Sequence, residues 1–267
     1  MKKKIRRIFD SILLGLLLTG MGLMLGFVDY EQNATICKKV EIIMHYGHSE
    51  ILIPESDIDS LIRQQSGVIQ GLPMWRINTE KIERAITKQP YVLQANVFET
   101  YPGDVHVHVF QRQPTLRIMT ETNKGYYIGD QGVILPINPD HPARVLIASG
   151  HIPDACFVGS SAGSEQHPAA SANSSRLLSD LYKLALFINR KPFFKAQVDQ
   201  IYVNKNGEYE LIPKVGDHIV LLGNVEDLED KFQRLFIFYK RGLNKIGWNR
   251  YNVINIKYKN QVVCSKI

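Results

Sequence analysis

A serine framed by glycines is the residue whose type and spacing come nearest to a catalytic nucleophile. Residues 159–163 read GSSAG and match the G-x-S-x-G pattern, in which Ser161 would attack an ester or an amide. That chemistry requires a strand before the serine, a helix after it, and an acid and a histidine further along the chain. Residues 158–175 are instead rich in Ser, Ala and Gly, which predicts a flexible surface loop. A membrane-anchored hydrolase that uses Ser161 is therefore only the second of the two alternative functions considered below.

Histidines are the other residues that could carry chemistry, through a bound metal ion. His106 and His108 fall on one face of a predicted strand and could share a metal, but a zinc site needs three or four converging ligands. The three cysteines lie far apart in the sequence, and no C-x-x-C spacing occurs. We therefore predict no metal and no cofactor. Because phosphate-binding loops and paired acids are also missing from the sequence, it favours a non-enzymatic protein.

The first residues have the pattern of a membrane anchor. The net charge is +6, but five cations fall within residues 1–7, so the remainder is nearly neutral and a nucleic-acid-binding patch is not expected. Residues 8–28 include a charge-free run from Ser11 to Val28, which as a helix would be roughly 27 Å long and could cross a membrane. A cleavable signal peptide is the alternative. The basic residues before the run predict a cytoplasmic N-terminus, with the bulk of the chain outside the cytoplasm.

Residues 38–113 have the pattern of a small α+β unit. A strand at 38–45 is followed by two helices, of which the second is capped by Asn78 and ends before Pro90. Two alternating runs then predict an antiparallel hairpin. The order strand, helix, helix, strand, strand predicts both helices on one face of the sheet. The apolar face of the hairpin is expected to comprise Leu93, Ala95, Val97, Val105, Val107 and Val109.

This element order is that of the polypeptide-transport-associated (POTRA) domain, and the hairpin resembles the bacterial FtsQ/DivIB cell-division family. In that family a helix precedes a P-x-V-x-x-A-x-V strand, which residues 90–97 match as PYVLQANV. The exit motif E-R-x-P is matched by QRQP at 111–114, with Gln111 in place of the acid. A POTRA protein of secretion or outer-membrane assembly is the first alternative. Such a protein would normally need a downstream barrel of many alternating strands, which two long helices do not predict.

Residues 114–267 predict a second, mixed α+β domain, the β-domain of that family. Short strands, the loop at 158–175 and two long helices follow one another along it. The first helix places Leu177, Leu181, Leu184 and Ile188 on one face, and the second is capped by Asn224. The family pattern with a glycine, an L-G pair and a following K-(apolar) helix is matched by Gly216, Leu222, Gly223, Lys231 and Leu235.

The closing residues of the chain predict a strand with one buried face. The resemblance implies that this last strand lies at a sheet edge and receives a strand from FtsB, within an FtsB–FtsL pair. An exposed edge offers unpaired N–H and C=O groups to such a strand. Lys257 is implied as an ionic partner for an acid of the partner, and Asn260-Gln261 as a turn or kink. The implied partner-binding residues are Ile254, Ile256, Lys257, Tyr258, Asn260, Gln261 and Val262.

Together these patterns predict an α+β, single-pass membrane protein without catalysis. Its parts would be a cytoplasmic N-terminus (1–7), a transmembrane helix (8–28), a β-α-α-β-β POTRA domain (38–113) and a β-domain (114–267) with a C-terminal edge strand. The resemblance implies a divisome scaffold in the inner membrane at the division septum, with its bulk in the periplasm. It would link early and late division proteins by holding FtsB- and FtsL-like partners, and its POTRA domain is available for other division proteins.

Overall fold

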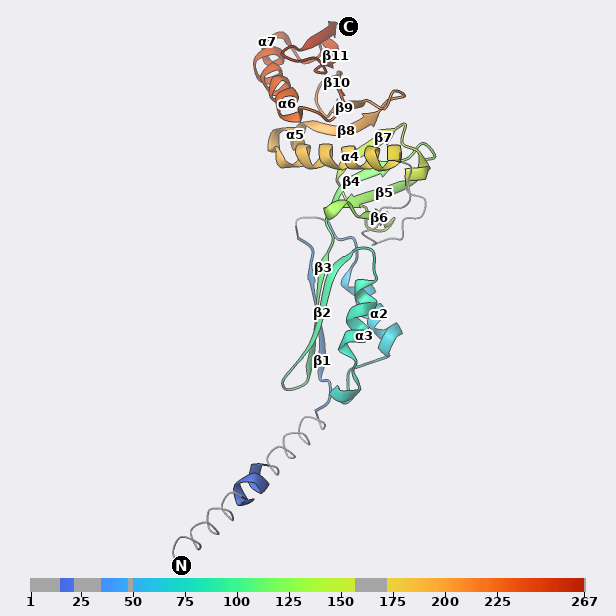
Figure 1. The fold of residues 1–267 in the computed structure, drawn as a ribbon, viewed down its shortest axis with the longest axis vertical. Coiled ribbons are helices and arrows are strands. Elements are labelled where there is room, and N and C mark those ends of the chain that lie inside the picture. Colours follow the sequence, from blue (N-terminus) through green and yellow to red (C-terminus); the bar gives the residue numbers. More distant parts are fainter. Residues whose placement is uncertain (1–14, 22–34, 48–49, 157–171, 267) are drawn as a thin grey trace, which may run out of the picture. The chain divides into compact units, whose positions relative to one another are not determined.

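The computed structural model describes residues 15–21, 35–47, 50–156 and 172–266, which form two compact units (Figure 1). Unit 1 comprises Met1–His45, Pro54–Thr87 and Gln94–Val109, and unit 2 comprises Tyr46–Ile53, Lys88–Leu93 and Phe110–Ile267. No helix within the described ranges is both long enough and apolar enough to cross a membrane. Residues 15–21 are helical. The rest of the predicted span at 8–28 lies outside the described residues.

Unit 1 is a three-stranded sheet with two helices on one face (Figure 1). The order is β1-β3-β2, formed by β1 (Lys39–His45), β3 (Asp104–Gln111) and β2 (Val92–Thr100). Central β3 alternates as predicted, because Val105, Val107 and Val109 are fully buried while the residues between them are not. Helices α2 (Glu55–Ser66) and α3 (Thr79–Thr87) each bury two isoleucines, and a short 3₁₀ helix, η1 (Met74–Arg76), lies between them. The β-α-α-β-β order is confirmed.

Local signals fix the ends of these helices, and one predicted face is wrong. The Asn78 side chain accepts a hydrogen bond from the Lys81 backbone N–H (2.8 Å), so it caps α3. Gly67 follows α2 with a φ of 73°, a conformation that glycine adopts easily. In β2, however, Leu93 is 39 % exposed, whereas Val92 is buried. The strict alternation predicted from Leu93 therefore holds only from Ala95 onward.

Unit 2 is built on a nine-stranded mixed sheet, which the sequence predicted only as a series of strands. The strand order is β12-β11-β10-β9-β8-β7-β4-β5-β6. Three neighbouring pairs are parallel, namely β4 with β7, β7 with β8, and β10 with β11. The strands are β4 (Pro114–Met119), β5 (Gly125–Gly129), β6 (Ile134–Pro136), β7 (Leu146–Gly150), β8 (Val198–Val203), β9 (Tyr209–Pro213), β10 (Ile219–Gly223), β11 (Tyr251–Asn255) and β12 (Val263–Lys266).

Helices provide the crossovers that two of these parallel pairs require. Helices α4 (Ala172–Arg190) and α5 (Pro192–Gln197) connect β7 to β8, after the 3₁₀ turn η3 (Asp154–Cys156). Helix α6 (Leu228–Ile237), the π-helical turn η4 (Phe238–Leu243) and α7 (Asn244–Ile246) connect β10 to β11. Each crossover leads to the neighbouring strand on the β12 side, and all four connected strands run in the same direction. Right-handed connections therefore place the helices of both crossovers on the same face of the sheet.

Aromatic packing joins these helices into one core. The ring of Phe232 on α6 lies 4.9 Å from that of Phe187 on α4 and 4.7 Å from that of Phe194 on α5. The predicted apolar face of α4 is confirmed, since Leu181, Leu184 and Ile188 are fully buried in the same cluster and Leu177 packs against it. Helix α4 begins at Ala172, so the end of the loop predicted at 158–175 is helical. The rest of that loop, Ser161 included, lies outside the described residues.

Two short segments from early in the chain also belong to unit 2. Leu52 packs with Tyr127 and Leu135 in a small second core. The buried Gln111 side chain fixes this segment: its oxygen accepts a hydrogen bond from the Leu52 N–H (2.7 Å), and its amide donates to the Glu50 carbonyl (2.9 Å). A carboxylate could accept but could not donate. The glutamine that departs from the acid of the family motif therefore satisfies both contacts at this position.

A candidate partner-binding edge

The nine-stranded sheet ends in two strands that differ in how open they are. At one end, β6 has three residues, of which Ile134 and Leu135 are buried and Pro136 has no backbone N–H to offer. Asn138, just after it, donates to the Leu52 carbonyl (2.9 Å), so an early segment of the chain packs there. At the other end, β12 pairs only with β11 in the described sheet, and three of its four residues are exposed. The more open edge of this sheet is therefore β12.

The C-terminal residues form a hairpin, which differs from the single edge strand predicted. Strand β11 lies inside the sheet, parallel to β10 on one side and antiparallel to β12 on the other. Ile254 pairs with Val220 of β10 and with Cys264 of β12. The edge therefore consists of Val263–Lys266 rather than of the strand that contains Ile254. The edge differs from the prediction because residues 256–262 reverse the chain, so that β12 pairs antiparallel with β11.

The structure brings the seven predicted partner-binding residues together in this hairpin, but in different environments. Ile254 and Ile256 are fully buried in the core of unit 2. Tyr258, Asn260 and Gln261 are exposed in the connection, where Asn260 has a φ of 58°, which suits a turn. Val262 packs against the core and is half-buried. The exposed members are therefore turn residues beside the edge, while the two isoleucines hold β11 in place.

Arg234 of α6 holds the turn between the two strands. Its guanidinium donates to the carbonyl oxygens of Tyr258 (2.6 Å), Gln261 (2.5 Å) and Ile256 (3.2 Å). It also pairs with Asp230 one helical turn earlier (3.0 Å), and its side chain is only 14 % exposed. A planar group with five donors suits several carbonyls at once, which a lysine could not match. The position of β12 at the edge therefore depends on a side chain of α6.

Lys257 already has an acidic partner within unit 2. Its ammonium group lies 2.8 Å and 2.9 Å from the two carboxylate oxygens of Glu208, which precedes β9. The hydrogen bond from Lys257 lowers the pKa of Glu208, and the hydrogen bond to Glu208 raises the pKa of Lys257. Both groups are partly exposed, so this contact resembles a surface ion pair. An acid from a partner would have to compete with Glu208 for this lysine.

His106 and His108, which the sequence placed on one strand face, lie on β3 of unit 1, next to β1. His108 Nδ1 is 3.3 Å from His45 Nε2 of β1, and His106 lies 3.5 Å from a carboxylate oxygen of Glu41. The rings of His106 and His108 also pack against Phe98 of β2. In the described part of the chain, no group of three or more His, Cys, Asp or Glu side chains is arranged to hold a metal ion.

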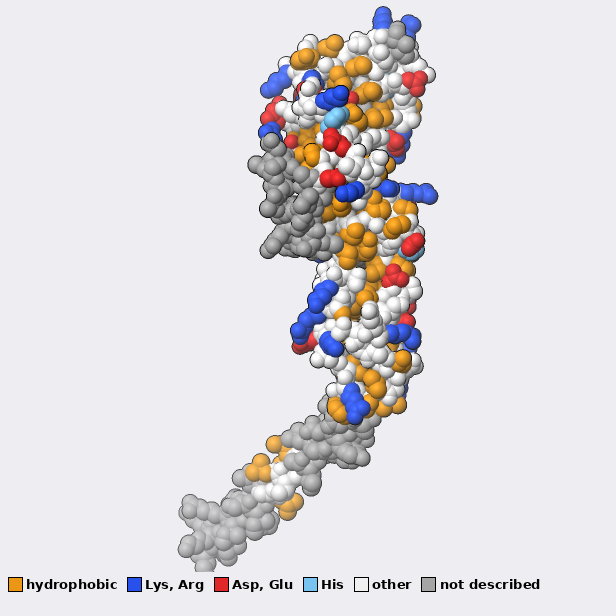
Figure 2. Space-filling model, turned by 90° about the vertical axis from the view of Figure 1, so that its right-hand side faces the viewer, with side chains coloured by type: hydrophobic (Ala, Val, Ile, Leu, Met, Phe, Trp, Pro, Cys, Tyr) orange, Lys and Arg blue, Asp and Glu red, His pale blue; other side chains and the backbone are white. Residues whose placement is uncertain are grey.

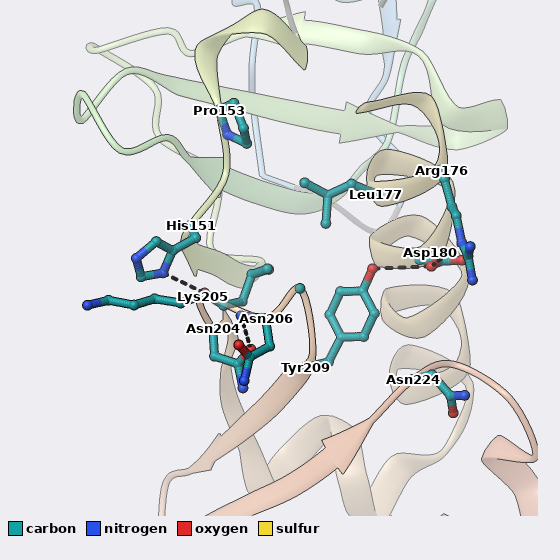
Figure 3. Close-up of a pocket in the computed structure, with 12 residues that line it drawn as sticks. His151, Pro153, Arg176, Leu177, Asp180, Asn204, Lys205, Asn206, Tyr209 and Asn224 are labelled. Carbon is teal, nitrogen blue, oxygen red and sulfur yellow. Dashed lines mark hydrogen bonds and ion pairs between the residues drawn. The ribbon is translucent and has the colours of Figure 1, made fainter. Parts of the chain in front are cut away.

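A groove of about 530 Å³ lies between α4 and the β8–β9 turn in unit 2 (Figure 3). The Tyr209 hydroxyl donates to Asp180 (3.3 Å), and Arg176 lies 3.8 Å from the same carboxylate. Burial raises the pKa of Tyr209, so this phenol stays protonated. Figure 3 shows His151 on the opposite side of the groove from Asp180. Tyr209 and Arg176 thus bind the Asp180 carboxylate, and these contacts account for the polar residues of the groove without a ligand.

Three features of the candidate edge could not be predicted from local sequence patterns. Arg234 is 24 residues from Tyr258, and Glu208 is 49 residues from Lys257, so neither contact follows from local spacing. Strand β12 has only four residues, too few for a clear period-two alternation. The one available hint was Asn260-Gln261, which marked a turn but not its direction.

Comparison with known protein families divides the chain between residues 110 and 113. A POTRA-like domain matches residues 35–110, and the family described as FtsQ/DivIB, C-terminal related, matches residues 113–265. No curated protein matches the chain. The second match covers more than half of the sequence and includes the sheet of unit 2 except for the last residue of β12. This chain therefore belongs to the FtsQ/DivIB, C-terminal related family, with a POTRA-like domain preceding the family region.

Proposed function

We propose that this protein is a non-enzymatic, division-related scaffold that captures FtsB- and FtsL-like partners by adding a strand to β12. The POTRA-like and FtsQ/DivIB-related domains support the division role. The proposal includes membrane anchoring by residues 8–28, with residues 38–113 and 114–267 as the two domains outside the cytoplasm. It also places the protein in the inner membrane at the division septum. There it would link early and late division proteins.

The observation that carries the mechanism is the asymmetry of the sheet in unit 2. One end is short, proline-containing and packed beside residues 50–53, whereas β12 exposes Val263, Ser265 and Lys266. Every second residue of an edge strand points its N–H and C=O groups away from the sheet. A partner strand that pairs with these groups would extend the sheet by one strand. Exposed Tyr258 and Gln261 in the adjoining turn would contact side chains of the same partner.

Proline substitution at two adjacent positions of β12 tests strand addition. Cys264→Pro and Ser265→Pro each remove one N–H, and neighbouring residues of a strand point their N–H groups to opposite sides. One variant therefore disrupts the β11–β12 pairing, while the other removes only an outward donor and leaves the hairpin folded. Hydrogen exchange at residues 251–266 identifies which is which. This comparison is sharper than deletion of residues 253–267, which would also remove the buried Ile254 and Ile256.

Co-purification with the FtsB- and FtsL-like proteins of the same cell gives the readout. We expect the variant with the intact hairpin to lose capture of these partners, and undiminished capture by that variant would exclude addition at β12. The division role is tested separately by depleting the protein and observing septation by microscopy. Filaments without septa are the expected result, and normal septation on depletion would contradict the division role altogether. Ser161→Ala should leave septation unchanged, whereas a hydrolase would lose its function.

A further inference from the structure

One end of unit 1 is assembled from three chain segments that are distant in sequence. Residues 35–38 pass between the loop that leads into η1 and the β2–β3 turn. The Met74 N–H donates to the Thr35 carbonyl (2.9 Å), and the Cys37 N–H donates to the Leu72 carbonyl (2.8 Å). On the other side, the Lys38 N–H donates to the Gly103 carbonyl (2.8 Å). These backbone bonds hold the segment where the chain enters unit 1 against η1 and the turn (Figure 1).

This end exposes large apolar and aromatic side chains. Ile36 is 49 % exposed, Trp75 62 % and Tyr101 90 %. We call these three residues the basal cluster. The Arg76 guanidinium lies 4.9 Å from the centre of the Trp75 ring, and Lys38 is also exposed. In the view of Figure 2, orange side chains lie beside blue Lys and Arg side chains at this end of unit 1. Single exposed apolar residues are common, but three from separate segments at one end of a small unit suggest a docking surface.

The chemistry of the basal cluster fits the interface of a lipid bilayer. Trp and Tyr concentrate at the level of the lipid headgroups, because their rings are apolar and their N–H or O–H groups bind water. Arg and Lys beside them extend their charged ends toward phosphates while their stems cover apolar surface. Glu99 and Asp104 lie on the same hairpin, so the charge of this end is mixed. The aromatic residues, rather than net charge, therefore favour a membrane interface at this end.

The short segment between the proposed membrane span and Thr35 would keep this end close to the membrane. Only residues 29–34 separate the predicted membrane span, which ends at residue 28, from Thr35, the first described residue after that span. Six residues cover at most about 20 Å when fully extended. Because the headgroup layer itself adds several ångströms on each side of the hydrocarbon core, the basal cluster can reach it without unfolding.

We propose that the basal cluster docks unit 1 onto the outer surface of the bilayer that anchors the chain, with Trp75 and Tyr101 at headgroup level. This inference rests on the membrane anchor of the proposed function. It is separate from strand addition, because all of its residues belong to unit 1. Docking would limit the motion of the POTRA-like domain relative to the membrane. The alternative is that a partner protein, rather than lipid, covers the basal cluster.

The two tryptophans of the chain allow a direct test. Full-length protein is placed in nanodiscs of phosphatidylcholine with or without bromine on the acyl chains near the headgroups, which quenches tryptophan on contact. The Trp248→Phe variant reports Trp75, and the matched Trp75→Phe variant reports Trp248, which is packed against Tyr239 in unit 2. We expect Trp75 to lose most of its emission in brominated discs and to emit at shorter wavelength than in detergent. Trp248 should change little. Ile36→Ser with Tyr101→Ser, in the Trp248→Phe background, should restore Trp75 emission.

The outcomes separate this inference from the proposed function. If the chain enters nanodiscs but Trp75 is no more quenched than Trp248, the docking surface is excluded while the scaffold proposal stands. Docking that appears only after the FtsB- and FtsL-like proteins are added would assign the surface to a partner instead, and would also overturn the inference. If the chain does not enter nanodiscs at all, both the anchor and the docking surface fail. Capture of partners at β12 would still be measured independently.

Discussion

Replacing Arg234 should destabilise the C-terminal hairpin by much more than loss of the Arg234–Asp230 ion pair alone would. Arg234→Leu replaces the aliphatic stem of the arginine by an apolar side chain on α6 and removes the donors to the carbonyls of Ile256, Tyr258 and Gln261. A hydrogen bond from a charged donor contributes about 1.5–3 kcal/mol when its acceptor cannot reach water. Here two of the acceptors belong to exposed residues, so water can replace the guanidinium at them. About 1 kcal/mol each is therefore appropriate, or about 2–3 kcal/mol in total.

Hydrogen exchange measured by mass spectrometry is the assay, because the loss should be local. A destabilisation of about 2–3 kcal/mol corresponds to exchange about 30- to 150-fold faster for the protected amides of residues 256–266. Amides of β8 and β9 that exchange through local openings should keep their protection, since their pairing does not involve Arg234. The unfolding free energy of the whole domain, measured in urea, should fall by no more than the same about 2–3 kcal/mol.

Asp230→Asn is the matched control for this variant. It breaks the ion pair to Arg234 (3.0 Å) and leaves the three carbonyl contacts in place. Because the Asp230 side chain is 53 % exposed, this i,i+4 pair contributes about 0.3–0.5 kcal/mol, so exchange at 256–266 should change by no more than about twofold. Equal acceleration of exchange by both variants, or unchanged protection of the hairpin in Arg234→Leu, would refute this role of the Arg234 carbonyl contacts.

Two further predictions concern the core of unit 2. Gly150 and Gly207 both have positive φ, 100° and 75°, but a Cβ at Gly150 would clash with the Val203 carbonyl whereas a Cβ at Gly207 would meet open space. Gly207→Ala should lower the unfolding free energy by about 1 kcal/mol, and Gly150→Ala should lower it by at least about 2 kcal/mol more. Urea titration measures both values, and equal losses would contradict the clash at Gly150. His218 is buried and its Nε2 lies 2.9 Å from the Tyr239 hydroxyl, and burial lowers the pKa of His218. Since the unfolded chain then binds the proton more tightly, stability should be retained above about pH 6.5 and decrease as the pH falls toward the folded pKa. His218→Gln should flatten this dependence in urea titrations at several pH values, and an unchanged slope would contradict it.

Unit 1 could be predicted from the sequence because its determinants are local. Val105, Val107 and Val109 alternate within one strand, and Asn78 caps the helix that follows it directly. Each of these signals acts within a few residues, so the period of the apolar pattern and the capping residue are enough. Leu93 is the exception. Its strand begins in unit 2, and there Val92 rather than Leu93 is the buried residue.

The candidate edge could be predicted only in part, because its geometry depends on contacts between distant residues. The sequence correctly indicates a strand around Ile254 with a buried face. The turn that reverses the chain after Ile256 is held by Arg234, which lies on another element and binds the turn through backbone carbonyl groups. Backbone acceptors have no sequence signature, so no pattern in residues 256–262 could reveal this contact. The edge consequently lies one strand further along the sheet than predicted.

The contact between Lys257 and Glu208 bears on what would give a partner its affinity. An acid on the partner could bind Lys257 only by displacing Glu208, which already occupies two of the donors of the ammonium group. Exchanging one partly exposed carboxylate for another yields little net free energy, because both the old and the new pair are partly hydrated. The backbone groups of β12 carry no such cost if they face only water before binding. Affinity at this edge should therefore come mainly from main-chain pairing and from the apolar surface of Tyr258, with Lys257 contributing to specificity through the choice of the opposing acid.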